Sequence, residues 1–161
     1  MENKFLKFCG MFVLPLIAAV PLLLCGITKY NYTGILNITG LRPYAIAGGL
    51  FYGLILFLLL QKIHPAKVNK RFLFFWFLGI ITPYAKGSLL GQCHLLFALL
   101  GTIILQFCIY PLWYKNHTIT QCYFASCFLT FLIVITSNAI TGPAELAYAV
   151  PLPILLSLLC K

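Results

Sequence analysis

Side chains that could do chemistry are scarce in this chain, and two of them lie inside apolar stretches. His94 is the only histidine within a long apolar run. Glu145 is the only acidic residue besides Glu2, because aspartate is absent. Ionisable groups within a membrane are costly unless they pair or face water, so they mark candidate sites. These two residues are therefore the first candidates for a functional site.

The same scarcity argues against most enzyme classes. A catalytic metal site needs several histidine or acidic ligands, and here one of each lies in an apolar run. Ser88 and His94 are six positions apart, so on a helix they point to different faces and make a poor nucleophile–base pair. The seven cysteines form no CxxC pair. We predict no catalytic residue, no metal ligand and no cofactor, and we expect no enzymatic activity.

Five polar residues are predicted to share one side of the membrane and to form a ligand-binding cluster. They are Arg42, Lys86, Gln92, His94 and Glu145. Three interpretations stay open. Glu145 could complement the dipole of a helix that starts behind Pro143 and bridge to a basic loop residue. The cluster could instead form an outward-facing pocket for a headgroup or small solute, or Glu145 and His94 could be a proton-linked pair.

The composition indicates the element type that carries these residues. The 161 residues are 62% hydrophobic and 8% charged, whereas a soluble domain has about 25% charged residues. The excess apolar surface must face lipid, so the fold class is all-α, a multi-pass transmembrane helix bundle. The apolar runs are too long and continuous for the alternating strands of a transmembrane barrel.

Six apolar runs have the length of transmembrane helices within one integral membrane domain, 1–161. An apolar run of about 20 residues spans a bilayer. The predicted spans are 8–27, 44–63, 68–84, 89–112, 118–140 and 144–160. Proline, glycine and basic residues separate them in short loops, so neighbouring helices run antiparallel. Pro151 and Pro153 are expected to kink the last span, because proline removes a helical hydrogen bond.

The basic residues predict the orientation. With the N-terminus inside, the cytoplasmic segments hold eight Lys and Arg residues and the outer segments hold three, Lys29, Arg42 and Lys86. The positive-inside rule therefore places both termini in the cytoplasm. Lys4 and Lys7 precede an apolar run, as in a signal peptide. That run is long and lacks a small-residue cleavage site, so we expect the first span to be retained.

The net charge of +9 predicts partners at the membrane surface. Its basic residues lie in loops between spans, which favours membrane lipids, with anionic headgroups at the cytoplasmic face, over nucleic acid. Gly49 and Gly53 form a GxxxG motif, which lets helix backbones approach closely. This motif predicts either internal packing or a homo-oligomer through Gly49 and Gly53.

Three short segments together resemble the six-span family that includes the damage-regulated autophagy modulators and small bacterial relatives of unassigned function. They are Thr39-Gly40-Leu41-Arg42-Pro43 ahead of the second span, His94-Leu-Leu-Phe-Ala98 early in the fourth, and Ala144-Glu145 opening the sixth. The resemblance implies a non-catalytic membrane protein that is associated with lipid or regulates a membrane process.

The leading functional hypothesis is a small integral membrane protein that binds lipid or a membrane partner through the outward-facing cluster. The alternative is a transporter or permease subunit for a small solute, with His94 and Glu145 on a proton-linked path. A membrane lipid-modifying enzyme is the third interpretation. We expect the protein in a cell membrane, with a bacterial plasma membrane as the first choice.

Overall fold

A computed structural model of the chain describes residues 2–38, 40–85 and 87–160, and all regular structure in them is helical. A first helix is continuous through α1 (Glu2–Phe8), the π-helical turn η1 (Cys9–Val13) and α2 (Leu14–Cys25). The following elements are α3 (Tyr32–Leu36), α4 (Arg42–Ile63), α5 (Lys67–Ile81), α6 (Leu89–Ile109), the 3₁₀ turn η2 (Tyr110–Tyr114), α7 (His117–Ser137), α8 (Gly142–Ala149) and α9 (Pro151–Leu159). The predicted all-α class is confirmed.

Five helical stretches within the described residues are long and apolar enough to cross a membrane. They are Asn3–Cys25, Arg42–Ile63, Leu89–Tyr114, His117–Ser137 and Gly142–Leu159. Each overlaps a predicted span. The predicted third span corresponds to α5, which has 15 residues and falls short of the 18 that define such a stretch.

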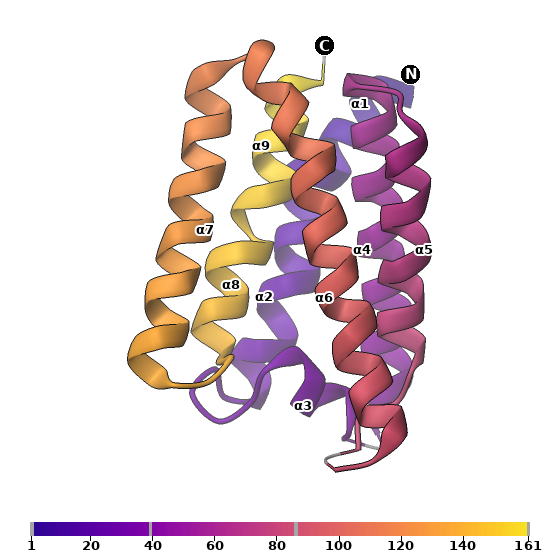
Figure 1. The fold of residues 1–161 in the computed structure, drawn as a ribbon, viewed down its shortest axis with the longest axis vertical. Helices are drawn as coiled ribbons and strands as arrows, with labels where there is room; N and C mark the ends of the chain where they lie inside the picture. The colour runs from indigo at the N-terminus through magenta and orange to yellow at the C-terminus, as the bar shows by residue number, and fades with distance from the viewer. Residues whose placement is uncertain (1, 39, 86, 161) are drawn as a thin grey trace.

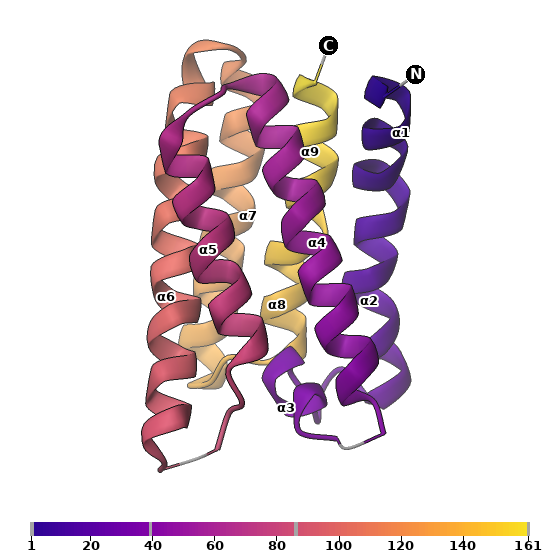
Figure 2. The same ribbon diagram turned by 90° about the vertical axis from the view of Figure 1, so that its right-hand side faces the viewer.

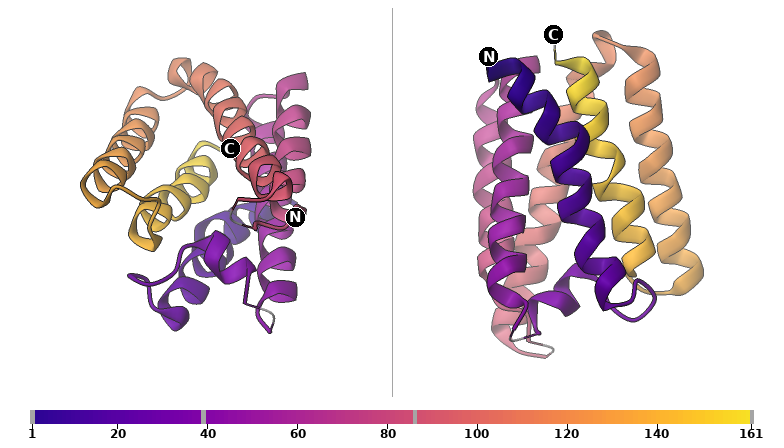
Figure 3. Two further views of the ribbon diagram at one scale, coloured as in Figure 1. Left: turned by 60° about the horizontal axis from the view of Figure 1, so that its bottom comes forward. Right: turned by 180° about the vertical axis from the view of Figure 1, so that it is seen from behind.

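The helices lie side by side, and both termini lie at the same end of the bundle (Figures 1 and 2). We call this end the terminal end. The α4–α5 and α6–α7 links lie there too. The opposite end, here the loop end, holds α3 and the α5–α6 and α7–α8 links. Viewed from the loop end, α7 lies at the periphery, beside α8 (Figure 3).

Small residues set the spacing between α4, α5 and α6. A Cβ on Gly53 would lie 2.2 Å from Cδ1 of Trp76, and one on Gly49 would lie 2.8 Å from Cδ1 of Ile80. The Trp76 indole also donates to the Gly49 carbonyl oxygen at 2.8 Å. The GxxxG motif thus packs α4 against α5 within one chain. The homo-oligomer expected through Gly49 and Gly53 stays a prediction, and it would require this intramolecular contact to give way.

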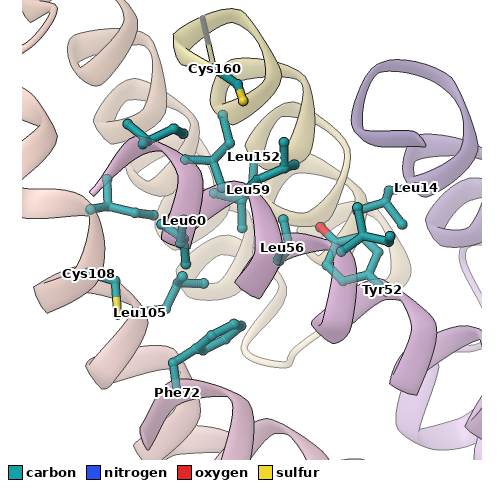
Figure 4. Close-up of a cluster of buried hydrophobic side chains, with 14 of the residues drawn as sticks. Leu14, Tyr52, Leu56, Leu59, Leu60, Phe72, Leu105, Cys108, Leu152 and Cys160 are labelled. Atoms are coloured by element: carbon teal, nitrogen blue, oxygen red, sulfur yellow. The ribbon is translucent and has the colours of Figure 1, made fainter. Parts of the chain in front are cut away.

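The larger apolar core cluster joins α4 to the first helix and to α5, α6, α7 and α9 (Figure 4). Leu56, Leu59 and Leu60 of α4 are fully buried, as are Phe72 of α5 and Leu105 of α6. A smaller cluster lies at the loop end, where Ile35 and Leu36 of α3 pack with Leu22 and Ala45. Because α3 buries these two side chains, it is part of the packed bundle.

Pro21, Pro151 and Pro153 lie within two of the long helical stretches, and the carbonyl that each of them frees accepts from a hydroxyl group. A proline at position i removes the hydrogen bond to the carbonyl of residue i−4. Pro151 and Pro153 thus free the carbonyls of Ala147 and Ala149, which accept from Ser126 Oγ and from the Tyr52 hydroxyl at 2.6 Å. Likewise Pro21 frees the Ile17 carbonyl, which accepts from the Tyr32 hydroxyl.

The expected interruption of the last span is therefore present, because α8 ends at Ala149 and α9 begins at Pro151. Neighbouring helices satisfy the freed backbone groups, which is what makes proline tolerable within an apolar bundle. These bonds also hold α8 against α7 and α4.

Candidate functional site

The short helix α3 covers the loop end of the bundle and organises the candidate site (Figure 3). Asn31 caps it, because its side-chain oxygen accepts from the Gly34 amide at 2.7 Å. The Asn31 Nδ2 donates to the Ile140 carbonyl at 2.9 Å, which joins α3 to the α7–α8 link. Gly142, the first residue of α8, leaves room for the link between α2 and α3. A Cβ at Gly142 would lie 2.4 Å from the Ile27 carbonyl oxygen in that link.

Glu145 holds the start of α3. Its carboxylate oxygen Oε2 accepts a hydrogen bond from the backbone N–H of Tyr32, the first residue of α3. The first amides of a helix lack partners within the helix, and a carboxylate there also complements the helix dipole. Burial, with the charge of Glu145 adding to it, raises the pKa of Tyr32 to about 12. The Tyr32 phenol donates to the Ile17 carbonyl.

His94, on α6, contacts the residue of α3 that follows Tyr32. Its Nδ1 donates to the Thr82 carbonyl at 2.9 Å, so in the neutral ring Nε2 is the acceptor. The Thr33 hydroxyl lies 3.4 Å from Nε2. The ring is buried, 4% exposed, and Tyr84 packs edge-on against it at 5.6 Å between centroids. His94 and Glu145 therefore bind consecutive residues of α3, Thr33 and Tyr32.

Two other residues of the predicted cluster are exposed, whereas His94 is buried. Arg42, at the start of α4, and Gln92, in the first turn of α6, are exposed at the same end of the bundle. Lys86 lies outside the described residues. The basic partner expected for Glu145 is not Arg42 or His94 in the described part of the chain, because its carboxylate bonds to a backbone amide instead.

A second polar network, which the sequence reasoning missed, lies between α6, α7 and α8. The Tyr123 hydroxyl donates to Gln106 Oε1 at 2.9 Å, and Gln106 Nε2 lies 3.3 Å from the Tyr148 hydroxyl. The two hydroxyls are 3.5 Å apart. A glutamine and two tyrosines inside predicted spans were the available signal. Tyrosine in a span more often marks an interface, so the signal was not specific.

The arrangement offers binding and positioning chemistry. Within residues 2–38, 40–85 and 87–160, no group of three or more His, Cys, Asp or Glu side chains could hold a metal ion. The Thr141 hydroxyl, which precedes α8, is buried at the loop end without a hydrogen-bond partner in the described part of the chain.

Comparisons with models of known families, with curated proteins and with solved structures found no match to this chain. The geometry of the loop end and of the helix surfaces therefore supplies the basis for inferring a function.

Proposed function

We propose that this chain is a six-span integral membrane protein of a cell membrane that binds lipid without catalysing a reaction. In this proposal α5 is a short third span, which brings the number of spans to six, and both termini face the cytoplasm. At about 1.5 Å per residue its 15 residues reach roughly 22 Å, which local bilayer thinning can accommodate. The lipid headgroup binds at the loop end, around α3.

The observation that supports the proposal is that His94 and Glu145 bond within the protein at the loop end, whereas Arg42 and Gln92 are exposed there. His94 and Glu145 are both occupied in holding α3, so they are poorly placed to act as a general acid or base. Arg42 and Gln92 are exposed beside it and can meet a phosphate and a glycerol ester.

Lipid retention in matched variants tests this proposal. Arg42 and Lys62 are exposed basic residues at opposite ends of α4, so Arg42→Ala and Lys62→Ala remove the same charge from the two ends. We expect native mass spectrometry of mildly solubilised protein to find bound phospholipid in wild type and Lys62→Ala, and several-fold less in Arg42→Ala. Equal retention in both variants would refute a headgroup site at the loop end.

A second candidate, a proton-linked transporter subunit, is favoured by one observation. Because His94 and Glu145 hold consecutive residues of α3, a displacement of α3 would uncover both groups together. Reconstituted vesicles loaded with a pH-sensitive dye and given a panel of amino acids and sugars test this idea. A solute-dependent proton flux that disappears in Glu145→Gln would replace the lipid-binding proposal.

A further inference from the structure

A groove of about 280 Å³ lies between α6 and α7, away from the loop end. Its lining residues are Gln106, Phe107 and Tyr110 on one side and Phe124 on the other, and only their apolar atoms face it. The Gln106 amide is turned to Tyr123 and Tyr148, which explains why a glutamine can line an apolar groove. The groove can therefore take a hydrocarbon and has no free polar atom to offer a polar solute.

The depth of the groove places it beside acyl chains. Tyr110 is four residues before the end of the stretch Leu89–Tyr114, and Phe124 is seven residues after the start of α7. At about 2.0 Å per residue in the 3₁₀ turn η2 and about 1.5 Å per residue in α7, these positions are about 8 and 10 Å from the helix ends. With the helices across a bilayer, the groove begins just below the headgroups of the leaflet at the terminal end and opens sideways to lipid.

The link between α6 and α7, the helices that form the groove, is aromatic and basic. This link contains Lys115 and leads into His117, and both side chains are exposed. The Trp113 ring joins this link to the groove, because it lies 5.0 Å from the His117 ring and 6.4 Å from that of Phe124. Tryptophan and basic residues at a helix end are typical of the membrane interface.

Charge favours an anionic occupant. The Lys115 ammonium donates one hydrogen bond to the Ile63 carbonyl, which leaves two N–H groups for another acceptor. Glu145 lies at the other end of the bundle, so its charge does not compete. Basic sites between transmembrane helices on the cytoplasmic side are suited to anionic headgroups.

We propose that this groove holds one acyl chain of an anionic phospholipid, with its phosphate beside Lys115 and His117. The lipid belongs to the leaflet at the terminal end, so this site is separate from the loop-end site. The bound acyl chain holds α7 against α6. This contact matters for α7 because only Thr120 and Tyr123 of that helix are buried. Failure of one site leaves the other untouched, because they lie in opposite leaflets.

Photo-crosslinking with lipids that carry a diazirine on the acyl chain tests the site. The protein is reconstituted in vesicles with trace labelled phosphatidylglycerol or labelled phosphatidylcholine, and adducts are mapped by peptide mass spectrometry. We expect adducts at 106–110 and 124 to be several-fold more frequent with phosphatidylglycerol. Adducts at the exposed, lipid-facing Phe128 and Phe131 serve as the reference and should show no headgroup preference.

Matched variants separate headgroup and chain contacts. Lys115→Gln is expected to remove most of the headgroup preference, whereas Lys70→Gln, which removes an exposed charge of α5 at the same end, leaves it unchanged. Lys115→Arg keeps the charge and should retain the preference. Phe124→Trp fills the groove and should lower labelling with both lipids, which keeps the test informative if Lys115→Gln does not fold.

Three results would overturn the proposal. One is labelling of 106–110 and 124 with no headgroup preference. Another is an equal loss of preference in Lys115→Gln and Lys70→Gln. The third is groove labelling that rises when the protein is diluted in lipid while a dimer dissociates, because the occupant would then be a second copy of the chain.

Discussion

At the scale of single residues, tyrosine and serine hydroxyls donate to three backbone carbonyls that prolines leave without a helical donor. The Ile17, Ala147 and Ala149 carbonyls lose their helical donors to Pro21, Pro151 and Pro153. Each accepts instead from a tyrosine or serine of another element. An unsatisfied carbonyl in an apolar interior costs about 1–3 kcal/mol, so these hydroxyls stabilise specific helix pairs.

The Tyr52–Ala149 bond allows a reciprocal mutational test. Tyr52→Phe removes the donor at 2.6 Å while keeping the ring, and is expected to destabilise the folded protein by about 1 kcal/mol. Pro153→Ala supplies a backbone N–H to the same carbonyl. Tyr52→Phe should therefore cost much less in a Pro153→Ala background. Thermal unfolding in detergent, with the helical signal as readout, measures each corner of the cycle.

Tyr44→Phe is the control for that cycle, since the Tyr44 side chain is 78% exposed and its loss of a hydroxyl should leave stability unchanged. Equal destabilisation by Tyr52→Phe with and without Pro153 would contradict this role of the Tyr52 hydroxyl and leave general packing as the explanation.

The sequence could predict these hydrogen-bond donors and acceptors only in part. Pro151 and Pro153 mark a kink in any apolar helix, and the structure has it. The hydroxyls that compensate come from distant segments, and nothing in the local pattern selects Tyr52 over other tyrosines. Glu145 was expected to seek a charged partner. It bonds to a backbone amide of α3, and a backbone group leaves no signature in side-chain composition.

At the scale of elements, α3 and α5 are the two that differ most from the sequence reasoning. No predicted span includes residues 28–43, yet Asn31 and Glu145 cap a short helix there. A five-residue helix is too short to show periodicity, so only the tertiary contacts of α3 define it. In contrast, α5 begins at Lys67, one residue before the prediction, and ends at Ile81, three residues before it.

The contact between α4 and α5 predicts a large effect of a single methyl group. A Cβ at Gly53 would overlap the Trp76 indole, and the indole cannot swing away without losing its bond to the Gly49 carbonyl. Gly53→Ala is therefore expected to destabilise the fold by about 1–3 kcal/mol. It should also shift the tryptophan fluorescence, which thermal unfolding followed by emission would show.

Gly40→Ala is the matched control, because a Cβ at Gly40 meets nothing within 4 Å. If Gly53→Ala instead left stability unchanged and abolished a dimer, the glycines would join two copies, and the α4–α5 contact would have to differ from the one described.

At the scale of the whole molecule, the distribution of charge agrees with the arrangement of the helices. The basic residues of the terminal end outnumber those of the loop end. The former are Lys4, Lys7, Lys62, Lys67, Lys70, Arg71 and Lys115, and the latter are Lys29 and Arg42, within the described residues. Under the positive-inside rule this asymmetry favours the terminal end in the cytoplasm. Hydropathy and charge were enough to predict which basic residues lie together at one end of the bundle, because both are summed over many residues and tolerate local error. The side of the membrane on which that end lies stays a prediction.

The status of α5 decides the topology, and end-specific reporters test it. If α5 crosses the membrane, the chain crosses six times and both ends share one side. A fluorescent protein that matures only in the cytoplasm is expected to be bright when fused to either end. An alkaline phosphatase that is active only outside should be active when inserted at Gly40 or after Ser137.

If α5 lies on the surface, five crossings remain, the two ends report opposite sides, and the insertion after Ser137 is inactive. Because α5 packs against both α4 and α6 along the bundle (Figure 2), its removal from the membrane would unpack both neighbours, so we expect the six-span outcome.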